Sequence, residues 1–148
     1  MRRFGGKSGS LPPVQNRPLA HLVAVFLGGV LGSGLRLGLD TALPHSDAQF
    51  PLSTLLINVV GSFVLGWLTG GLFARGASSV LKAALGPGLL GSFTTFSAVI
   101  LALVLLTVST PPQVVLAVVY LVLTLVLGVG ASFLGIRLGE RSRTGVAE

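Results

Sequence analysis

The sequence has no cysteine among its 148 residues, and few of its residues carry a charge. The missing cysteines exclude disulfide bonds and every reaction that needs a thiolate. Only 9% of the residues are charged, whereas a typical soluble domain has about 25%. Hydrophobic residues make up 51% of the chain, and the mean hydropathy is +0.90. Because this composition cannot cover a soluble domain with polar side chains, we expect a membrane protein.

Acidic residues are the scarcest charged type, with four Asp and Glu against ten Lys and Arg. None of the four lies in the middle of an apolar segment. A proton-coupled cation exporter usually needs a carboxylate inside the membrane, and a hydrolase needs a nucleophile with a base and an orienting group. The sequence offers neither set, so we expect no enzyme. His21 and His45 lie near the ends of apolar segments and are interpreted as interfacial residues rather than metal ligands.

The net charge of +6 does not indicate a nucleic-acid partner. The basic residues cluster at the two ends of the chain and in one loop. A nucleic-acid-binding protein instead gathers them on one face, interleaved with aromatic residues. Basic residues beside apolar segments are better explained by membrane topology.

Four apolar segments each approach the length of about 20 residues that crosses the hydrocarbon core of a bilayer. They cover residues 19–39, 52–73, 85–108 and 114–134. The sequence therefore predicts an all-α membrane protein with four transmembrane helices. Residues 1–18 are predicted to form a flexible basic tail, residues 19–136 the transmembrane domain, and residues 137–148 a polar C-terminal tail.

Basic residues mark one side of this predicted bundle. Nine of the ten Lys and Arg residues lie before the first span, between the second and third, or after the fourth. Only Arg36 lies toward the opposite face. Because Lys and Arg are retained in cytoplasmic loops, the bias predicts a multi-pass protein of the cell membrane with one orientation and both termini in the cytoplasm.

Small and polar residues inside the spans carry most of the remaining information. Small residues recur at intervals of four, as is typical of close helix packing. They are Gly28 and Gly32 in the first span, and Ser62, Gly66 and Gly70 in the second. The polar side chains are neutral and rich in hydrogen-bond donors. They are Asn58 in the second span, Thr94, Thr95 and Ser97 in the third, and Tyr120 and Thr124 in the fourth. Such groups either join helices by hydrogen bonds or form a lining that replaces water around a small anion.

The third span contains residues that weaken a helix, in the stretch "GPGLLGSFTTFS" at 86–97. Gly86, Pro87, Gly88 and Gly91 disfavour helix, and the adjacent Thr94 and Thr95 crowd it. A broken helix at membrane depth leaves free carbonyls that can hold a cation and free N–H groups that can face an anion. Phe96 can present its positive ring edge to an anion. The alternative is that Pro87 merely occupies the first turn of a continuous helix.

Three motifs resemble the signatures of the Fluc/CrcB fluoride channels. They are "GGVLGSGLR" at 28–36, "STLLINVVGSFVLG" at 53–66 and "GLLGSFTTFS" at 88–97. The resemblance implies passive export of fluoride through two pores along the contact between two antiparallel four-helix subunits, and a sodium ion at the centre of the dimer.

The resemblance also implies roles for particular residues. The backbone carbonyls of Gly91 and Thr94 would hold the sodium ion, Asn58 would be the pore amide, and Phe96 would contact fluoride. Three further positions would complete the fluoride path: Tyr120 and Thr124 on the polar track of the fourth span, and Arg36 near a pore vestibule. The polar lining expected from the residues themselves adds Thr95 and Ser97.

Three positions depart from the family pattern. Val99 stands where a second phenylalanine is usual, Ala102 where a glutamate is common, and Gly128 where the polar track has a hydroxyl. Together with the charge bias, these departures favour one subunit of an antiparallel heterodimer, although a homodimer remains open. The competing hypotheses are a small dual-topology multidrug transporter, which lacks its membrane carboxylate here, and a non-transporting assembly subunit.

Overall fold

The computed structural model describes residues 18–43 and 50–144 of the chain. These residues form helices and contain no strand. Four helical stretches are long and apolar enough to cross a membrane: Pro18–Ala42, Leu52–Phe73, Ser79–Val108 and Val114–Ser142. The expected all-α membrane protein with four spanning helices is therefore confirmed. Residues 1–17 of the tail predicted at 1–18, His45 and the last four residues lie outside the described residues, and Pro18 already belongs to the first helix.

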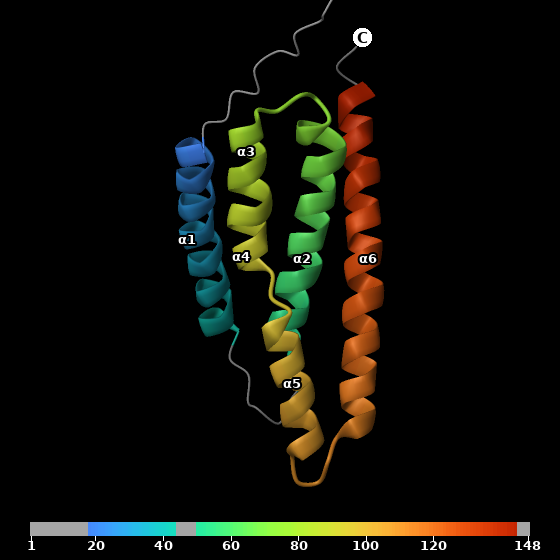
Figure 1. The fold of residues 1–148 in the computed structure, drawn as a ribbon. Helices are drawn as coiled ribbons and strands as arrows, with labels where there is room; N and C mark the ends of the chain where they lie inside the picture. Colours follow the sequence, from blue (N-terminus) through green and yellow to red (C-terminus); the bar gives the residue numbers. More distant parts are fainter. Residues whose placement is uncertain (1–17, 44–49, 145–148) are drawn as a thin grey trace, which may run out of the picture.

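The four spans alternate in direction, so that consecutive spans are antiparallel (Figure 1). The first span is α1 (Pro18–Ala42), and the second is α2 (Leu52–Leu68) continued by the π-helical turn η1 (Thr69–Phe73). The third comprises α3 (Ser79–Ala83), the π-helical η2 (Ala84–Leu90), α4 (Gly91–Phe93) and α5 (Ser97–Val108). The fourth is α6 (Val114–Thr144).

The fourth span extends further than the apolar pattern indicates. We expected a polar tail from residue 137, but α6 continues to Thr144. Arg, Leu and Glu in this stretch are good helix formers, so helical propensity persists after the apolar run has ended. The guanidinium of Arg75 also donates a hydrogen bond to the backbone carbonyl of Ser142, which satisfies one of the carbonyls at the helix end.

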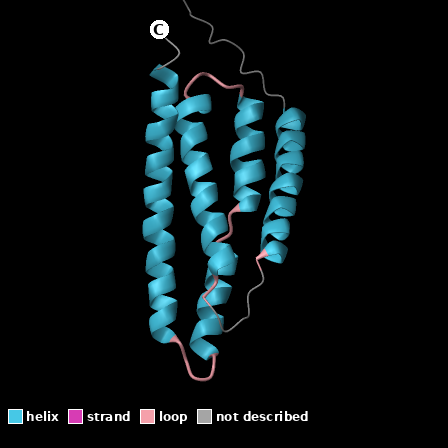
Figure 2. Ribbon diagram, turned by 180° about the vertical axis from the view of Figure 1, so that it is seen from behind, coloured by secondary structure: helices cyan, strands magenta, loops and turns pink. Residues whose placement is uncertain are grey.

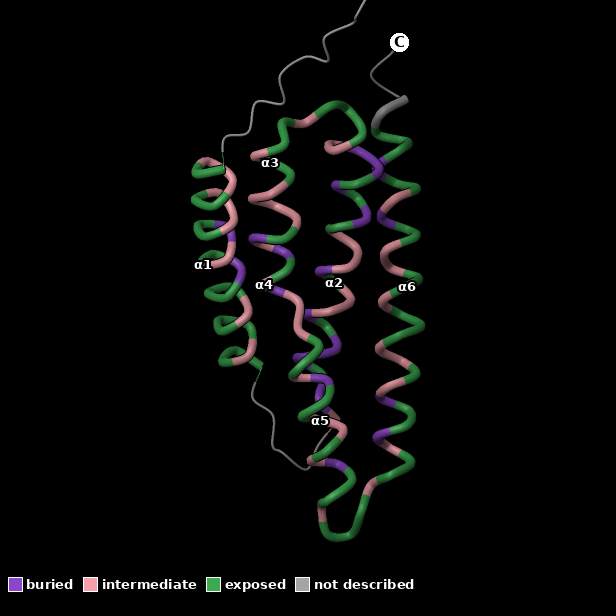
Figure 3. The backbone as a smooth tube through the Cα atoms, in the orientation of Figure 1, coloured by how far each residue is buried: buried purple, intermediate pink, exposed green. Residues whose placement is uncertain are grey.

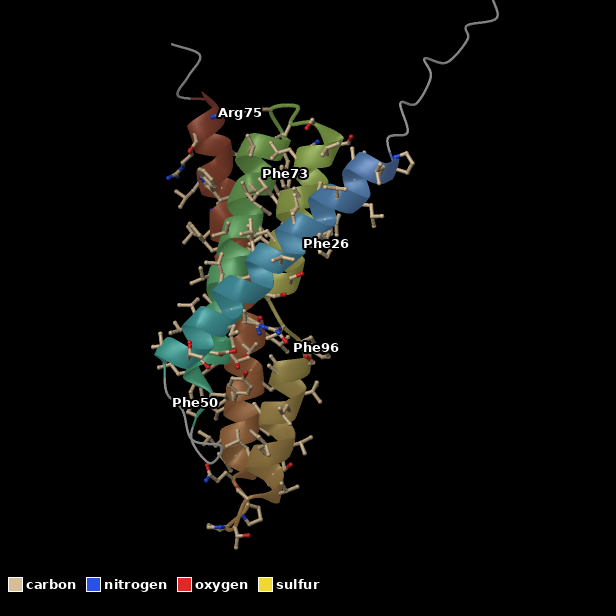
Figure 4. The ribbon with its side chains drawn as sticks, turned by 90° about the vertical axis from the view of Figure 1, so that its left-hand side faces the viewer. Phe26, Phe50, Phe73, Arg75 and Phe96 are labelled. Carbon is tan, nitrogen blue, oxygen red and sulfur yellow. The ribbon has the colours of Figure 1, made fainter. Side chains whose placement is uncertain are left out.

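Two pairs of elements build the bundle. The second span packs along α6, and α1 packs on η2 and α4. Figure 2 shows the same neighbours from behind, and Figure 4 shows α1 crossing the bundle obliquely. Below the interruption of the third span, α5 packs on the first half of α6. The upper and lower halves of the third span therefore have different partners.

Glycines allow these helices to approach backbone to backbone. A Cβ atom on Gly66 would lie 2.2 Å from the carbonyl oxygen of Ser132, and one on Gly70 would lie 2.3 Å from that of Ile136. On α1, a Cβ atom on Gly32 would lie 2.1 Å from the carbonyl oxygen of Leu89. The interpretation of these glycines as packing residues is confirmed. Small residues have this role in membranes because lipid gives no hydrophobic drive for helix association.

Buried residues follow the inner sides of the helices, and the outer sides are exposed (Figure 3). The best buried cluster contains Leu55, Val99 and Tyr120, which are 6%, 2% and 0% exposed. The ring of Phe50 packs on Tyr120 edge-on, with ring centroids 5.6 Å apart. This cluster joins α2, α5 and α6 below the interruption, and it fixes the position of the lower half of the third span.

Candidate functional site

The third span is interrupted between Phe93, where α4 ends, and Ser97, where α5 begins. Thr94 has an extended backbone with φ −75° and ψ 153°. Gly86, Pro87 and Gly88, which disfavour an α-helix, do not interrupt the span but lie within its π-helical part. Pro87 lies inside the π-helical η2 rather than in the first turn of the span, which begins at Ser79. The wider π turn tolerates the missing N–H of proline, so the chain stays helical there and leaves the helix only after Phe93.

Asn58 on α2 holds the interruption open. Its side-chain amide donates a hydrogen bond of 2.9 Å to the carbonyl of Thr95 and accepts one of 2.8 Å from the N–H of Thr95. The amide thus satisfies both backbone groups of one non-helical residue. Unsatisfied backbone groups are costly at membrane depth, which explains why a primary amide stands at this position. One of the two N–H donors of Asn58 remains after these bonds are made.

Several backbone carbonyls lose their helical donors as a result, among them those of Gly91 and Thr94. In a continuous helix the carbonyl of Gly91 would accept from the N–H of Thr95, but that N–H donates to Asn58. The carbonyl of Thr94 would accept from the N–H of Ala98, but that N–H donates to the hydroxyl of Thr95 at 3.2 Å. The interruption therefore frees the carbonyls of Gly91 and Thr94, which are hard oxygen ligands of the type that binds sodium.

The hydroxyls at the interruption have different surroundings. The Thr94 hydroxyl donates a hydrogen bond of 2.9 Å to the carbonyl of Leu90, and so stabilises the C-terminal end of α4. The Thr95 hydroxyl begins α5 by accepting from Ala98, and it lies 3.1 Å from the hydroxyl of Ser97. The side chains of Ser97 and Phe96 are exposed, Phe96 to 71%. Figure 4 shows Phe96 projecting outward from the bundle at the level of the interruption.

An open groove of about 740 Å³ brings most of these residues together. Its walls come from α2, from the third span and from α6. Five of the predicted site residues other than glycine line it: Asn58, Thr94, Thr95, Phe96 and Thr124. The carbonyl-bearing Gly91 lines it as well, between Leu90 and Thr94. Apolar side chains such as Leu65 and Val129 make up much of the remaining wall, so the polar groups stand in a largely apolar surface.

Three predicted residues lie outside this groove in the isolated chain. Tyr120 is fully buried in the core cluster, and its hydroxyl faces Thr54 and Thr124 without a well-formed hydrogen bond to either. Ser97 is exposed next to the groove, within hydrogen-bond distance of Thr95. Arg36 is half-buried on α1 and does not line the groove. The structure therefore gathers the polar residues of α2 and of the interruption, together with Thr124.

Two of the three positions that depart from the family pattern lie at the buried cluster. Val99 is part of it, and Ala102 packs against it. Val99 and Gly128 both line the groove, and a Cβ atom on Gly128 would meet the Ser62 hydroxyl at 3.7 Å. The second-phenylalanine position thus connects the groove with the core. A valine there leaves the groove wall with a smaller aliphatic group.

Two features of the site were missed in the sequence. Lys82 lines the groove, although we counted it only as a topology signal. The hydroxyl of Ser53 was not predicted as a polar group of the site, and like those of the predicted Tyr120 and Thr124 it is buried without a partner among the described residues. Ser53 stands at the start of α2, four residues before Ile57 on the buried face, and this spacing was the available signal that its hydroxyl points inward.

Comparison with known proteins gives a consistent set of relatives. A family model described as CrcB-like protein, Camphor Resistance (CrcB), matches residues 23–136. The fluoride-specific ion channel FluC of Oceanobacillus iheyensis is 37% identical over 121 residues, which are 81% of this chain and 92% of the relative. FluC 2 of Bacillus licheniformis is 40% identical over 119 residues, 80% of this chain and 86% of the relative. FluC of Novosphingobium aromaticivorans is 42% identical over 115 residues, 76% and 90% of the two chains. The matched region reaches all four spans and includes the interruption of the third, so this chain belongs to the CrcB family.

Proposed function

We propose that the chain is a subunit of a fluoride-selective channel, which lowers cytoplasmic fluoride by passive export across the cell membrane. The observation that carries the proposal is the interrupted third span, held open by Asn58 beside an exposed groove. Irregular backbone at membrane depth is tolerated where it lines an ion pathway or is covered by protein. The names of the relatives, fluoride-specific ion channels, supply the identity of the ion.

The groove has the donors that a small dehydrated anion needs. The second N–H of Asn58 and the hydroxyls of Thr95 and Ser97 replace part of the hydration shell, and the ring of Phe96 offers its positive edge. No Asp or Glu lies among the described residues that line the groove. An anion therefore meets donors without a fixed negative charge, which a cation pathway would have.

A sodium ion is the cofactor that the freed carbonyls fit. Gly91 and Thr94 offer two carbonyl oxygens from one chain, and Gly91 is exposed on the open side of the bundle. Two oxygens are too few for a bound cation. A second subunit of the same fold, related by an approximate two-fold axis, would supply the two equivalent carbonyls, since such a contact repeats the same backbone groups. The ion would neutralise the carbonyl dipoles of the two interruptions and hold the subunits together.

The second subunit is proposed to lie antiparallel against the groove. The exposed face carries Phe96 and the hydroxyl of Ser97 at the depth where an isolated chain would meet lipid tails. A protein partner can hydrogen-bond that hydroxyl, which lipid tails cannot do. Docking there would bring Thr124 and, beneath it, Tyr120 to a protein boundary. Arg36, in the second half of α1, would face a vestibule of the pore. The departures at Val99 and Gly128 favour an unlike partner.

One orientation with both termini in the cytoplasm is also proposed. Arg75 lies at the end of the bundle where α6 ends (Figure 4), Lys82 belongs to α3 and Arg137 to the last part of α6, whereas Arg36 lies in the second half of α1, which runs away from that end (Figure 1). This separation agrees with the positive-inside rule. A reporter fused after residue 148 should be active only in its cytoplasmic form. Substantial activity of a periplasmic reporter there would overturn this orientation.

The function is tested by fluoride-electrode efflux from liposomes that contain the full chain, alone and with a second CrcB-family subunit from the same genome. We expect rapid fluoride efflux with the pair, little with the chain alone, and no chloride efflux in either case. Rapid efflux from the chain alone would overturn the heterodimer but retain the channel. No efflux from either preparation would overturn the channel and favour an assembly subunit.

A further inference from the structure

Lys82 has a position that membrane topology does not explain. It lies in the last turn of α3, and its exposed side chain lines the groove at the end where Phe73 and Pro87 also stand. It is the only charged side chain among the described residues that line the groove. At the other end of the groove are Asn58 and Thr95. The groove thus has a cation at its cytoplasmic end and uncharged donors at membrane depth.

The other basic residues at this end of the bundle are engaged elsewhere. The Arg75 guanidinium donates to the carbonyl of Ser142 at the end of α6. The Arg137 guanidinium lies over the ring of Phe133, 4.3 Å from its centroid, and Arg137 does not line the groove. The Lys82 ammonium makes no hydrogen bond or ion pair within the described part of the chain. Among these three residues, Lys82 alone faces the groove with its charge available.

The distance from Lys82 to the interruption limits what it can do. Thr94 lies twelve positions further along the third span, and at no more than about 1.5 Å per position the two residues are separated by up to about 18 Å along the axis. This exceeds the Debye length of about 8 Å at physiological ionic strength, so Lys82 cannot bind the ion held at Asn58. It acts instead on ions that approach the open end of the groove. The apolar walls strengthen its field there because a low-dielectric cleft focuses field lines.

We propose that Lys82 gathers anions at the cytoplasmic mouth of the groove and so raises the rate at which they reach Asn58 and Thr95. The inference rests on the proposed anion-channel function, which it extends with an electrostatic recruiting step. Lys82 is a recruiting residue rather than part of the ion-binding lining. A unit charge about 6 Å from the ion path in water changes the local anion concentration about threefold, before screening by salt.

The test compares Lys82→Gln with Arg137→Gln in the full chain, in whichever assembly conducts fluoride. The two substitutions remove the same charge from the same end of the bundle, but only Lys82 lines the groove. Initial fluoride efflux is measured with an electrode at about 0.01 M and about 1 M ionic strength, set with sodium gluconate. The Debye length falls between these conditions from about 30 Å to about 3 Å, which switches the recruiting field off.

We expect Lys82→Gln to lower efflux about threefold at low ionic strength and to match the unsubstituted chain at high ionic strength. Arg137→Gln should change efflux by less than about 1.5-fold in both conditions, and Lys82→Arg should restore the rate. An equal loss in both salts would show a structural role for Lys82, and an equal effect of the two glutamine variants would show a general surface potential. Either result would overturn the recruiting role of Lys82 but would leave the proposed channel function intact. Absence of efflux from the unsubstituted assembly would overturn the channel itself, and the recruiting step with it.

Discussion

Asn58→Ala is the substitution that most directly tests the site, because one side chain satisfies both backbone groups of Thr95. Alanine removes the 2.9 Å and 2.8 Å hydrogen bonds and leaves the N–H and the carbonyl of Thr95 without partners. Each unsatisfied group costs about 1–3 kcal/mol when it is buried. The two together raise the free energy of the interrupted form by about 2–6 kcal/mol.

The span can escape this cost by becoming continuous. The N–H of Thr95 would then return to the carbonyl of Gly91, and one of the two freed carbonyls would be lost as an ion ligand. Because about 1.4 kcal/mol corresponds to a factor of ten, even the lower figure of about 2 kcal/mol makes the open interruption about 30-fold rarer. The donor of the ion pathway disappears at the same time. We therefore expect fluoride efflux to fall at least about tenfold.

The assay is fluoride-electrode efflux from liposomes, with thermal unfolding to confirm that the variant folds. Ser62→Ala is the matched control, since Ser62 lies one turn further along α2, lines the same groove and makes no hydrogen bond within the described residues. It should change efflux by less than about twofold. Hydrogen exchange at the Thr95 amide gives a second readout of its hydrogen-bond partner. An Asn58→Ala protein with efflux within about twofold of the unsubstituted chain would refute the reasoning.

Three further changes test other parts of the structure. Gly66→Ala places a Cβ atom 2.2 Å from the Ser132 carbonyl oxygen and should lower the free energy of unfolding by about 1–3 kcal/mol. The control Gly34→Ala, with nothing within 4 Å, should be neutral or stabilising. Equal effects in thermal unfolding would contradict the close contact between α2 and α6. Thr95→Val removes the hydroxyl that caps Ala98 and should cost about 1 kcal/mol and lower efflux severalfold, while Thr95→Ser should restore both; a fully active valine variant would exclude the hydroxyl from the pathway. Replacing sodium by N-methyl-D-glucamine should lower the melting temperature of the assembly, because a ligand bound only to the folded state stabilises it; identical melting in the two salts would argue against the sodium site.

The spans and the neighbourhood of the site could be predicted from the sequence because both rest on local composition. About 20 apolar residues are required to cross a bilayer wherever they occur, and glycines at intervals of four mark a close helix contact. The motif at 88–97 indicated where the third helix would be disturbed. Local propensity, however, ranked Gly86 and Pro87 as the strongest helix breakers, and the structure keeps them helical within η2.

The position of the interruption depends on a contact that local rules do not contain. Asn58 and Thr95 are 37 residues apart, and their two hydrogen bonds form only because α2 passes beside the third span. The same limit applies to Lys82. It lines the same groove as Asn58, but the two residues are far apart in the sequence, so local patterns could not bring them together. The end of α6 was missed for another reason: apolar periodicity stops near residue 136, while helix propensity and the Arg75 contact carry the helix on.

The division of polar groups within one chain is itself an argument for a second subunit. Asn58 and Thr95 satisfy each other and open the backbone, but the groups that face outward from this point are Phe96, 71% exposed, and the exposed Ser97. Tyr120, by contrast, is 0% exposed, and its hydroxyl has no partner in the core. A single chain therefore carries half of a lining on its surface and a further donor sealed just beneath it. Hydrocarbon offers no further hydrogen-bond partner to the Ser97 hydroxyl, and nothing in the described chain offers one to the Tyr120 hydroxyl. A protein surface docked on the groove would offer the exposed Ser97 the hydrogen-bond partners that lipid lacks, and this is the argument for a second subunit.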